Sequence, residues 1–197
     1  MTVGEAAANS DANSTKSALS SPKPVSVLFV CLGNICRSTM AEGVFQSLTR
    51  PANKPAYPLI AKIDSCGTGA YHVGDSPDSR TMSMLADNGI STYRHRARKF
   101  HTKDFADFDY ILAMDDDNLE HLQRLRAREA KNRGGEGVKM GKVMLFGDFG
   151  GGKRRSGRGE EVQDPYYGGH DGFEIAYEQS VRFSKAFIEM LENGELS

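Results

Sequence analysis

The feature that most constrains this chain is a hydrophobic run that leads directly into a cysteine-containing segment. Residues 25–30 read Val-Ser-Val-Leu-Phe-Val, a β-branched and aromatic-rich stretch typical of a buried strand. Beyond Ser38 the apolar residues recur at helical spacing. They are Met40, Val44, Phe45 and Leu48. Residues 31–38, Cys-Leu-Gly-Asn-Ile-Cys-Arg-Ser, are therefore predicted to join the end of a strand to the start of a helix.

Such a junction is suited to binding an anion. Backbone N–H groups can point inward there, and the helix N-terminus adds partial positive charge. Arg37 supplies a planar set of donors that matches phosphate, while Gly33 and Asn34 are residue types that tolerate left-handed backbone. The segment thus predicts a phosphate-binding loop. Its members besides Cys31 and Arg37 are Leu32, Gly33, Asn34, Ile35, Cys36 and Ser38.

Cys31 lies at the base of this predicted loop. Helix N-termini and cations favour the thiolate form of a nearby cysteine, and the thiolate is the nucleophilic form. The Ser38 hydroxyl can donate a hydrogen bond to that sulfur. We therefore predict that Cys31 attacks phosphorus.

Composition is typical of a soluble enzyme. The 197 residues are 39% hydrophobic, enough for one sizeable core, and the formal net charge is −1. With 3 cysteines and no strong basic bias, neither a disulfide scaffold nor a nucleic-acid partner is indicated. No apolar run approaches the roughly 18 residues of a membrane span, and a free reactive thiol points to the cytoplasm. The sequence sets no oligomeric state.

The chain divides into a tail and one domain. Residues 1–24 are rich in Ala, Ser and Asn and are predicted to be disordered, and residues 25–193 form the domain, with a Gly/Arg-rich loop near 147–161. Strands are predicted at 25–31, 59–64, 110–114 and 142–146, and helices at 38–48, 77–88, 116–128 and 173–191. This alternation indicates an α/β fold: a single three-layer domain with a four-stranded, parallel, doubly wound sheet and helices on both faces.

At these motifs the sequence resembles the low-molecular-weight protein tyrosine phosphatases. The family signature, Cys, five residues, Arg, Ser, is matched by residues 31–38, and the similarity continues through residues 107–115 and 164–168. Two departures are Thr39, where the family usually has proline, and the longer stretch between Gly147 and Glu161. The resemblance implies a flavodoxin-like fold. It also implies hydrolysis of tyrosine-phosphorylated proteins or aryl phosphates through a cysteinyl-phosphate. We expect neither cofactor nor metal, because the loop amides and Arg37 already neutralise the phosphate and no cluster of His and Asp ligands stands out.

The resemblance also assigns roles outside the loop. It places the general acid at Asp164, which opens an Asp-Pro-Tyr-Tyr turn, and loop support at Ser65 and His95. Tyr71, Tyr166 and Tyr167 are expected at the pocket rim. It further implies reversible oxidation through a bond between Cys31 and Cys36.

Some residues have simpler interpretations from their chemistry alone. His95 lies in the basic run 94–99, which is more often a solvated surface. Asp115, Asp116 and Asp117 are better explained as a helix cap than as a metal site. Cys66 is expected to be a small buried residue. His72, Asp75 and Asp78 are interpreted as structural.

Three alternatives share the loop or the fold. An arsenate reductase needs further cysteines downstream, and no cysteine follows Cys66. A phosphoarginine phosphatase typically has threonine where this chain has Ile35, which would crowd a guanidinium. A catalytically inactive phosphotyrosine-binding module would lack one of Cys31, Arg37 or Asp164, and all three are present.

Overall fold

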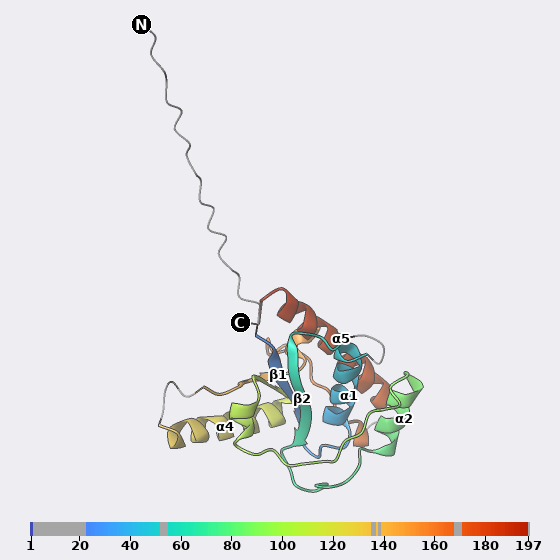
Figure 1. Cartoon of the computed structure of the whole chain (residues 1–197). Coiled ribbons are helices and arrows are strands. Elements are labelled where there is room, and N and C mark those ends of the chain that lie inside the picture. Colours follow the sequence, from blue (N-terminus) through green and yellow to red (C-terminus); the bar gives the residue numbers. More distant parts are fainter. Residues whose placement is uncertain (2–22, 52–54, 135–136, 138, 168–170, 197) are drawn as a thin grey trace.

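The structure is a computed structural model, and it carries a parallel four-stranded sheet at its centre (Figure 1). It describes residues 1, 23–51, 55–134, 137, 139–167 and 171–196, without the side chain of Tyr167. Most of the predicted tail, residues 1–24, lies outside these ranges.

The sheet has the order β2-β1-β3-β4, so the first strand of the chain is central. The strands are β1 (Val25–Cys31), β2 (Ile60–Gly67), β3 (Tyr110–Ala113) and β4 (Lys142–Leu145). All pairings are parallel, and the register sets Val30 of β1 between Cys66 of β2 and Ala113 of β3. Cys31 therefore ends the central strand at the carboxyl edge of the sheet, where α/β proteins bind ligands.

Helices cover both faces of this sheet, as Figure 1 shows. They are α1 (Arg37–Thr49), α2 (Ser79–Asp87), α3 (Asp104–Asp107), α4 (Asp116–Asn132) and α5 (Gly172–Glu192), with 3-10 helices η1 (Asp148–Gly150) and η2 (Pro165–Tyr167). α1, α2 and α5 pack together on one face, and α4 packs against β3 and β4 on the other. The predicted three-layer α/β fold is confirmed.

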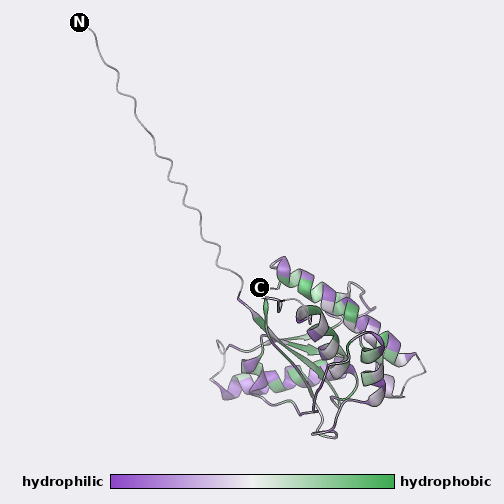
Figure 2. Ribbon diagram, turned by 45° about the vertical axis from the view of Figure 1, so that its right-hand side comes forward, coloured by the Kyte–Doolittle hydropathy of each residue, from purple (hydrophilic) through white to green (hydrophobic). Residues whose placement is uncertain are grey.

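The two faces of β1 explain the layers. Val27 and Phe29 belong to the core cluster beneath α1 and α5, whereas Leu28 and Val30 belong to the cluster beneath α3 and α4. Successive strand residues point to opposite faces, so a strand buried on both sides reads as a continuous apolar run. Figure 2 shows hydrophobic strands between helices of mixed hydropathy.

Several element boundaries differ from the prediction. α2 begins at Ser79 rather than 77, because Asp78 caps it by accepting a hydrogen bond from the backbone N–H of Arg80. α4 continues to Asn132, four residues beyond the predicted end. α3 and the two 3-10 helices lack an amphipathic repeat and were not expected. Packing also extends past residue 193, since Leu196 is buried and its carbonyl accepts from the hydroxyl of Tyr110.

The buried stripe of α5 is also shifted from the prediction. Phe173, Phe187 and Leu191 are buried as expected, whereas Tyr177, Val181 and Ile188 are only partly buried. The rest of the buried face is made of Ala176, Ser180, Phe183 and Ser184. The hydrophobic pattern does not predict burial of Ala176, Ser180 and Ser184, because alanine and serine are buried here by close helix packing rather than by hydrophobicity.

The Gly/Arg-rich stretch at 147–161 forms an irregular hairpin whose ends pair in antiparallel bridges. Arg154 binds Asp116 at 2.9 Å and Glu161 at 3.2 Å, and Arg158 binds Asp116 at 3.0 Å. These ion pairs fasten the hairpin to the start of α4. They also lower the pKa of Asp116, chiefly through the hydrogen bond from Arg154.

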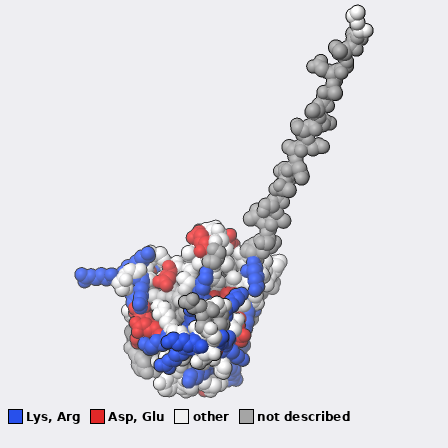
Figure 3. Space-filling view, turned by 90° about the vertical axis from the view of Figure 1, so that its left-hand side faces the viewer, with Lys and Arg blue, Asp and Glu red and all other residues white. Residues whose placement is uncertain are grey.

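The described surface carries both signs of charge. Figure 3 looks onto the side where α4 ends, and Lys and Arg side chains lie there beside Asp and Glu. Among the described helices, none combines the length and apolarity needed to cross a membrane.

Candidate active site

The loop between β1 and α1 is held in shape by Asn34. Asn34 has a φ of 58°, the one left-handed non-glycine residue among those described, so Asn34 rather than Gly33 makes the tight turn. Its side-chain amide donates to Ser38 at 3.0 Å and to Ser65 at 2.9 Å. Its carbonyl oxygen lies 2.9 Å from Nε2 of His95. The buried amide thus ties the loop to β2 and to the segment after α2.

Cys31 lies at the bottom of this loop with only 2% of its surface exposed. The backbone N–H of Asn34 donates to its sulfur at 3.2 Å, and the Ser38 hydroxyl lies 3.1 Å away. Both groups can donate to a thiolate. The contact with Ser38 is the one the sequence predicted.

Arg37 lies beside the sulfur, almost fully buried, between two carboxylates. Its guanidinium donates to Asp115 and, at 2.8 Å, to Asp164, and it also donates to the Val162 carbonyl at 3.2 Å. Burial acts to lower the pKa of Arg37, but the negative charges of Cys31, Asp115 and Asp164 outweigh it and raise that pKa. Arg37 therefore stays charged and fixed in orientation.

Asp115 has a second role that the sequence analysis missed. One oxygen caps α4 by accepting from the N–H of Asn118 at 2.7 Å, as predicted, and the other binds Arg37. The available signal was its position just after β3, at the edge where the loop of Cys31 also lies.

Asp164 reaches the loop from a distant part of the chain, just before η2. One carboxylate oxygen binds Arg37, and the other accepts from the N–H of Tyr166 at 3.0 Å. Its side chain is 35% exposed, so the carboxylate is open to a bound molecule. An acid at this place could exchange a proton with a group held above Cys31.

These groups surround one cavity of about 330 Å³. Its lining residues are Cys31, Leu32, Gly33, Ile35, Cys36, Arg37, Tyr71, His72, Asp164 and Tyr166. Tyr71 and Tyr166 are 78% and 45% exposed and stand at the mouth, whereas the side chain of Tyr167 lies outside the described part of the chain. The cavity thus has Cys31 and Arg37 in its lining and aromatic side chains at its mouth.

His72 also lines this cavity, although the sequence suggested a structural residue. Its Nδ1 lies 3.1 Å from Asp75, and its ring packs against Gly33. Residue type and spacing do not indicate this contact, because His72 reaches the loop only through the fold.

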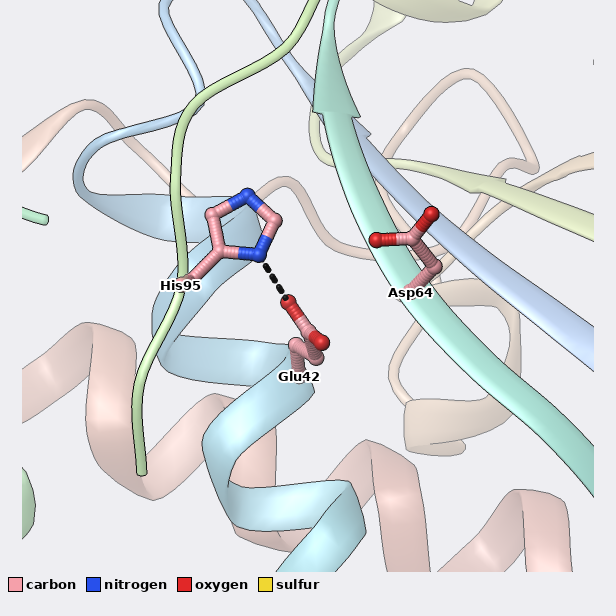
Figure 4. A group of neighbouring side chains, drawn as sticks. All are labelled: Glu42, Asp64 and His95. Atoms are coloured by element: carbon pink, nitrogen blue, oxygen red, sulfur yellow. Dashed lines mark ion pairs between the residues drawn. The ribbon is translucent and has the colours of Figure 1, made fainter. Parts of the chain in front are cut away.

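A buried network around Glu42 supports the loop (Figure 4). One Glu42 oxygen accepts from Ser65 at 2.7 Å and from Tyr93 at 2.8 Å, and lies 3.1 Å from Nδ1 of His95. The side chain of His95 is 8% exposed, so the solvated surface expected from chemistry alone is wrong. Burial, and then the charge of Glu42, raises the pKa of Tyr93 far above its ordinary range.

Glu42 and His95, together with Asp64, have the spacing of a metal site, with ligand atoms within 4.8 Å of one another. Figure 4 shows His95 and Glu42 facing each other, with Asp64 standing apart on β2. Asp64 is held by Arg98 at 2.8 Å and by the N–H of Ser65 at 2.8 Å. Because protein groups already occupy the donor atoms of all three, this arrangement is better explained as loop support than as a metal centre.

Burial disfavours the thiolate form of Cys36 and of Cys66. Burial raises the pKa of Cys36 to about 12, with further contributions from Asp78 and Cys31. Burial also raises the pKa of Cys66, which is fully buried as expected. Thr39, the residue that departs from the family pattern, donates its hydroxyl to the Cys36 carbonyl at 2.9 Å.

Taken together, a buried cysteine at the end of the central strand, with an arginine and an aspartate beside it in one cavity, defines an α/β protein whose strand-to-helix loop is suited to binding an anion. Residues 26–195 match the profile described as "Low molecular weight phosphotyrosine protein phosphatase". The chain belongs to this family.

Individual relatives agree with this assignment. The low molecular weight phosphotyrosine protein phosphatase of Schizosaccharomyces pombe is 47% identical over 169 residues, which cover 86% of this chain and 98% of that protein. The Homo sapiens protein of the same name is 41% identical, covering 83% and 94%.

Solved structures show the same fold. A protein tyrosine phosphatase from Entamoeba histolytica has a TM-score of 0.70 at 32% identity, covering 87% of this chain and 99% of that one. A Drosophila protein described as an arginine phosphatase has a TM-score of 0.70 at 33% identity, covering 85% and 98%.

Proposed function

We propose that this chain hydrolyses phosphotyrosine in proteins, and related aryl phosphates, with Cys31 as the nucleophile. The observation that carries the proposal is the convergence of Cys31, Arg37 and Asp164 on one cavity. Membership in the phosphotyrosine phosphatase family supports the substrate class.

In the first step the Cys31 thiolate attacks phosphorus. A sulfur–phosphorus bond forms while the bond between phosphorus and the tyrosyl oxygen breaks. Arg37 binds the phosphoryl oxygens, whose charge its guanidinium complements. Asp164, protonated at this stage, gives its proton to the departing tyrosyl oxygen.

In the second step a water molecule attacks the phosphocysteine. Asp164, now a carboxylate, takes a proton from that water as the new phosphorus–oxygen bond forms. The sulfur–phosphorus bond breaks, inorganic phosphate is produced and the Cys31 thiolate is restored. The Ser38 hydroxyl, 3.1 Å from the sulfur, stabilises this leaving thiolate by hydrogen bonding.

The walls of the cavity favour an aryl ester. Tyr71 and Tyr166 at the mouth offer faces against which a phenyl ring can stack. Ile35 lines the cavity and presents an apolar side chain rather than a group that could bind a guanidinium.

Phosphoarginine hydrolysis is the second candidate, favoured by the likeness to the Drosophila protein described as an arginine phosphatase. Arsenate reduction is weaker, because no cysteine follows Cys66 to relay electrons. Assaying aryl phosphate, phosphoserine, phosphoarginine and arsenate side by side separates these activities. We also place the protein in the cytoplasm, where a reactive thiol stays reduced.

The central test is Asp164→Ala, compared with wild type on phenyl esters of differing acidity. We expect kcat to fall by roughly 10²–10⁴-fold with little change in KM, and poor leaving groups to suffer most. Cys31→Ser should abolish turnover and phosphocysteine trapping. An equal loss across all phenols would show that Asp164 is not the proton donor.

A further inference from the structure

Arg80, near the start of α2, forms a two-pronged ion pair with Asp78. The carboxylate of Asp78 accepts from Nε of Arg80 at 3.0 Å and from Nη2 at 2.8 Å. The same carboxylate caps α2. Hydrogen bonds from Arg80 lower the pKa of Asp78, so this pair stays charged.

The guanidinium held in this way lies over two aromatic rings. It is 5.1 Å from the centroid of Tyr166 and 4.6 Å from that of Phe173. Both distances are within the range of cation–π attraction. Tyr166 belongs to η2 and Phe173 to the first turn of α5, so Arg80 joins α2 to two points that follow Asp164 in the chain.

Tyr166 connects this contact to the carboxylate of Asp164. Its backbone N–H donates to one Asp164 oxygen at 3.0 Å, while Arg37 fixes the other. Arg80 does not line the cavity, so it has no direct route to a bound phosphate. A small misplacement of a proton donor is enough to lower its efficiency.

We propose that Arg80 is a positioning residue that holds Tyr166, and through it the carboxylate of Asp164, over the phosphate-binding loop. This role rests on the proposed function of Asp164 as proton donor. This role predicts that loss of Arg80 weakens proton donation by Asp164 and leaves phosphate binding unchanged.

The first experiment compares Arg80→Leu with wild type on aryl phosphates whose phenols differ in acidity. On esters of weakly acidic phenols we expect kcat to fall about 5- to 30-fold, as for loss of two exposed cation–π contacts. Esters of strongly acidic phenols should change little, because such phenols leave without a proton. The inhibition constant for vanadate, which has no ring to stack on Tyr166, should stay near wild type.

Two further variants separate this role from a general loss of structure. Arg80→Lys keeps the charge but not the planar stacking surface, so we expect it to recover part of the lost rate. Arg124→Leu is the matched control, since Arg124 is an exposed arginine paired with Glu120 on its own helix. This control should behave as wild type.

The decisive measurement is a double-mutant cycle with Asp164→Ala. Once Asp164 is gone, Arg80→Leu should cause no additional loss of kcat. An additional loss in that background, or an equal loss on all phenols, overturns the proposal. If Arg80→Leu behaves as wild type while Asp164→Ala loses most activity on poor leaving groups, the role of Arg80 is rejected and the proposed function stands. If Asp164→Ala shows no dependence on the acidity of the phenol, the proposed function itself is rejected.

Discussion

Replacing Glu42 with glutamine tests how much the buried network contributes to stability. Glu42 is 4% exposed, and one of its oxygens faces Ser65, Tyr93 and His95 at 2.7, 2.8 and 3.1 Å. Glutamine has the same shape and can still accept, but without charge. A hydrogen bond to a charged group contributes about 1.5–3 kcal/mol and a neutral one about 0.5–1.5. Removing the charge should therefore cost about 1 kcal/mol per contact, or about 2–4 kcal/mol in total.

The assay is urea unfolding at pH 7, with the midpoint and slope fitted for each variant. Glu120→Gln is the matched control, because Glu120 is 52% exposed and its partner Arg124 lies 3.7 Å away. Its effect should be within about 0.5 kcal/mol. We expect kcat of Glu42→Gln to fall as well, since Ser65 and His95 hold Asn34 in place. Equal stability of the two variants would refute the importance of the network.

Three further predictions concern the loop. A Cβ on Gly67 would lie 2.7 Å from the carbonyl oxygen of Leu32. Gly67→Ala should therefore lower the free energy of unfolding in urea by about 1–3 kcal/mol and lower kcat. Unchanged values would show that the loop can move to accommodate the methyl group. Cys36→Ser should keep the basal rate but lose thiol-dependent recovery after peroxide, because we expect the Cys36 thiol to capture the sulfenic acid of oxidised Cys31 as a disulfide, with release of water. A peptide map that joins Cys31 to Cys66 would contradict this role. Vanadate and phosphate should inhibit competitively and exhaustive chelation should leave kcat unchanged; restoration of a lost rate by a divalent ion would count against this mechanism.

The parts of the site that could be predicted lie close together in the sequence. The strand, the loop and the helix of residues 25–49 form one continuous segment, so residue type and spacing carry the information. Asp164 lies far from that segment, and its role was inferred from the family resemblance. In the structure it binds Arg37 at 2.8 Å.

The parts that could not be predicted depend on contacts between distant segments. Asp115 reads as a helix cap, and only the fold brings its second oxygen to Arg37. His95 sits in a basic run that suggests solvent, yet its ring turns inward to Glu42 while Arg94 and Arg96 on either side remain exposed. The contact of Arg80 with Tyr166 likewise joins α2 to η2, two segments that show no common pattern in the sequence.

The central position of β1 has a consequence for how the protein is made. Cys31 is synthesised early, but β3 begins only at Tyr110, and α5, which packs on α1, ends at Glu192. At about 5–20 residues per second, roughly 8–30 s separate the synthesis of Cys31 from that of Glu192. Throughout that interval α1 lacks the covering layer that α5 provides. Activity should thus appear only when α5 docks, and chains truncated before α5 should aggregate through the uncovered face of α1.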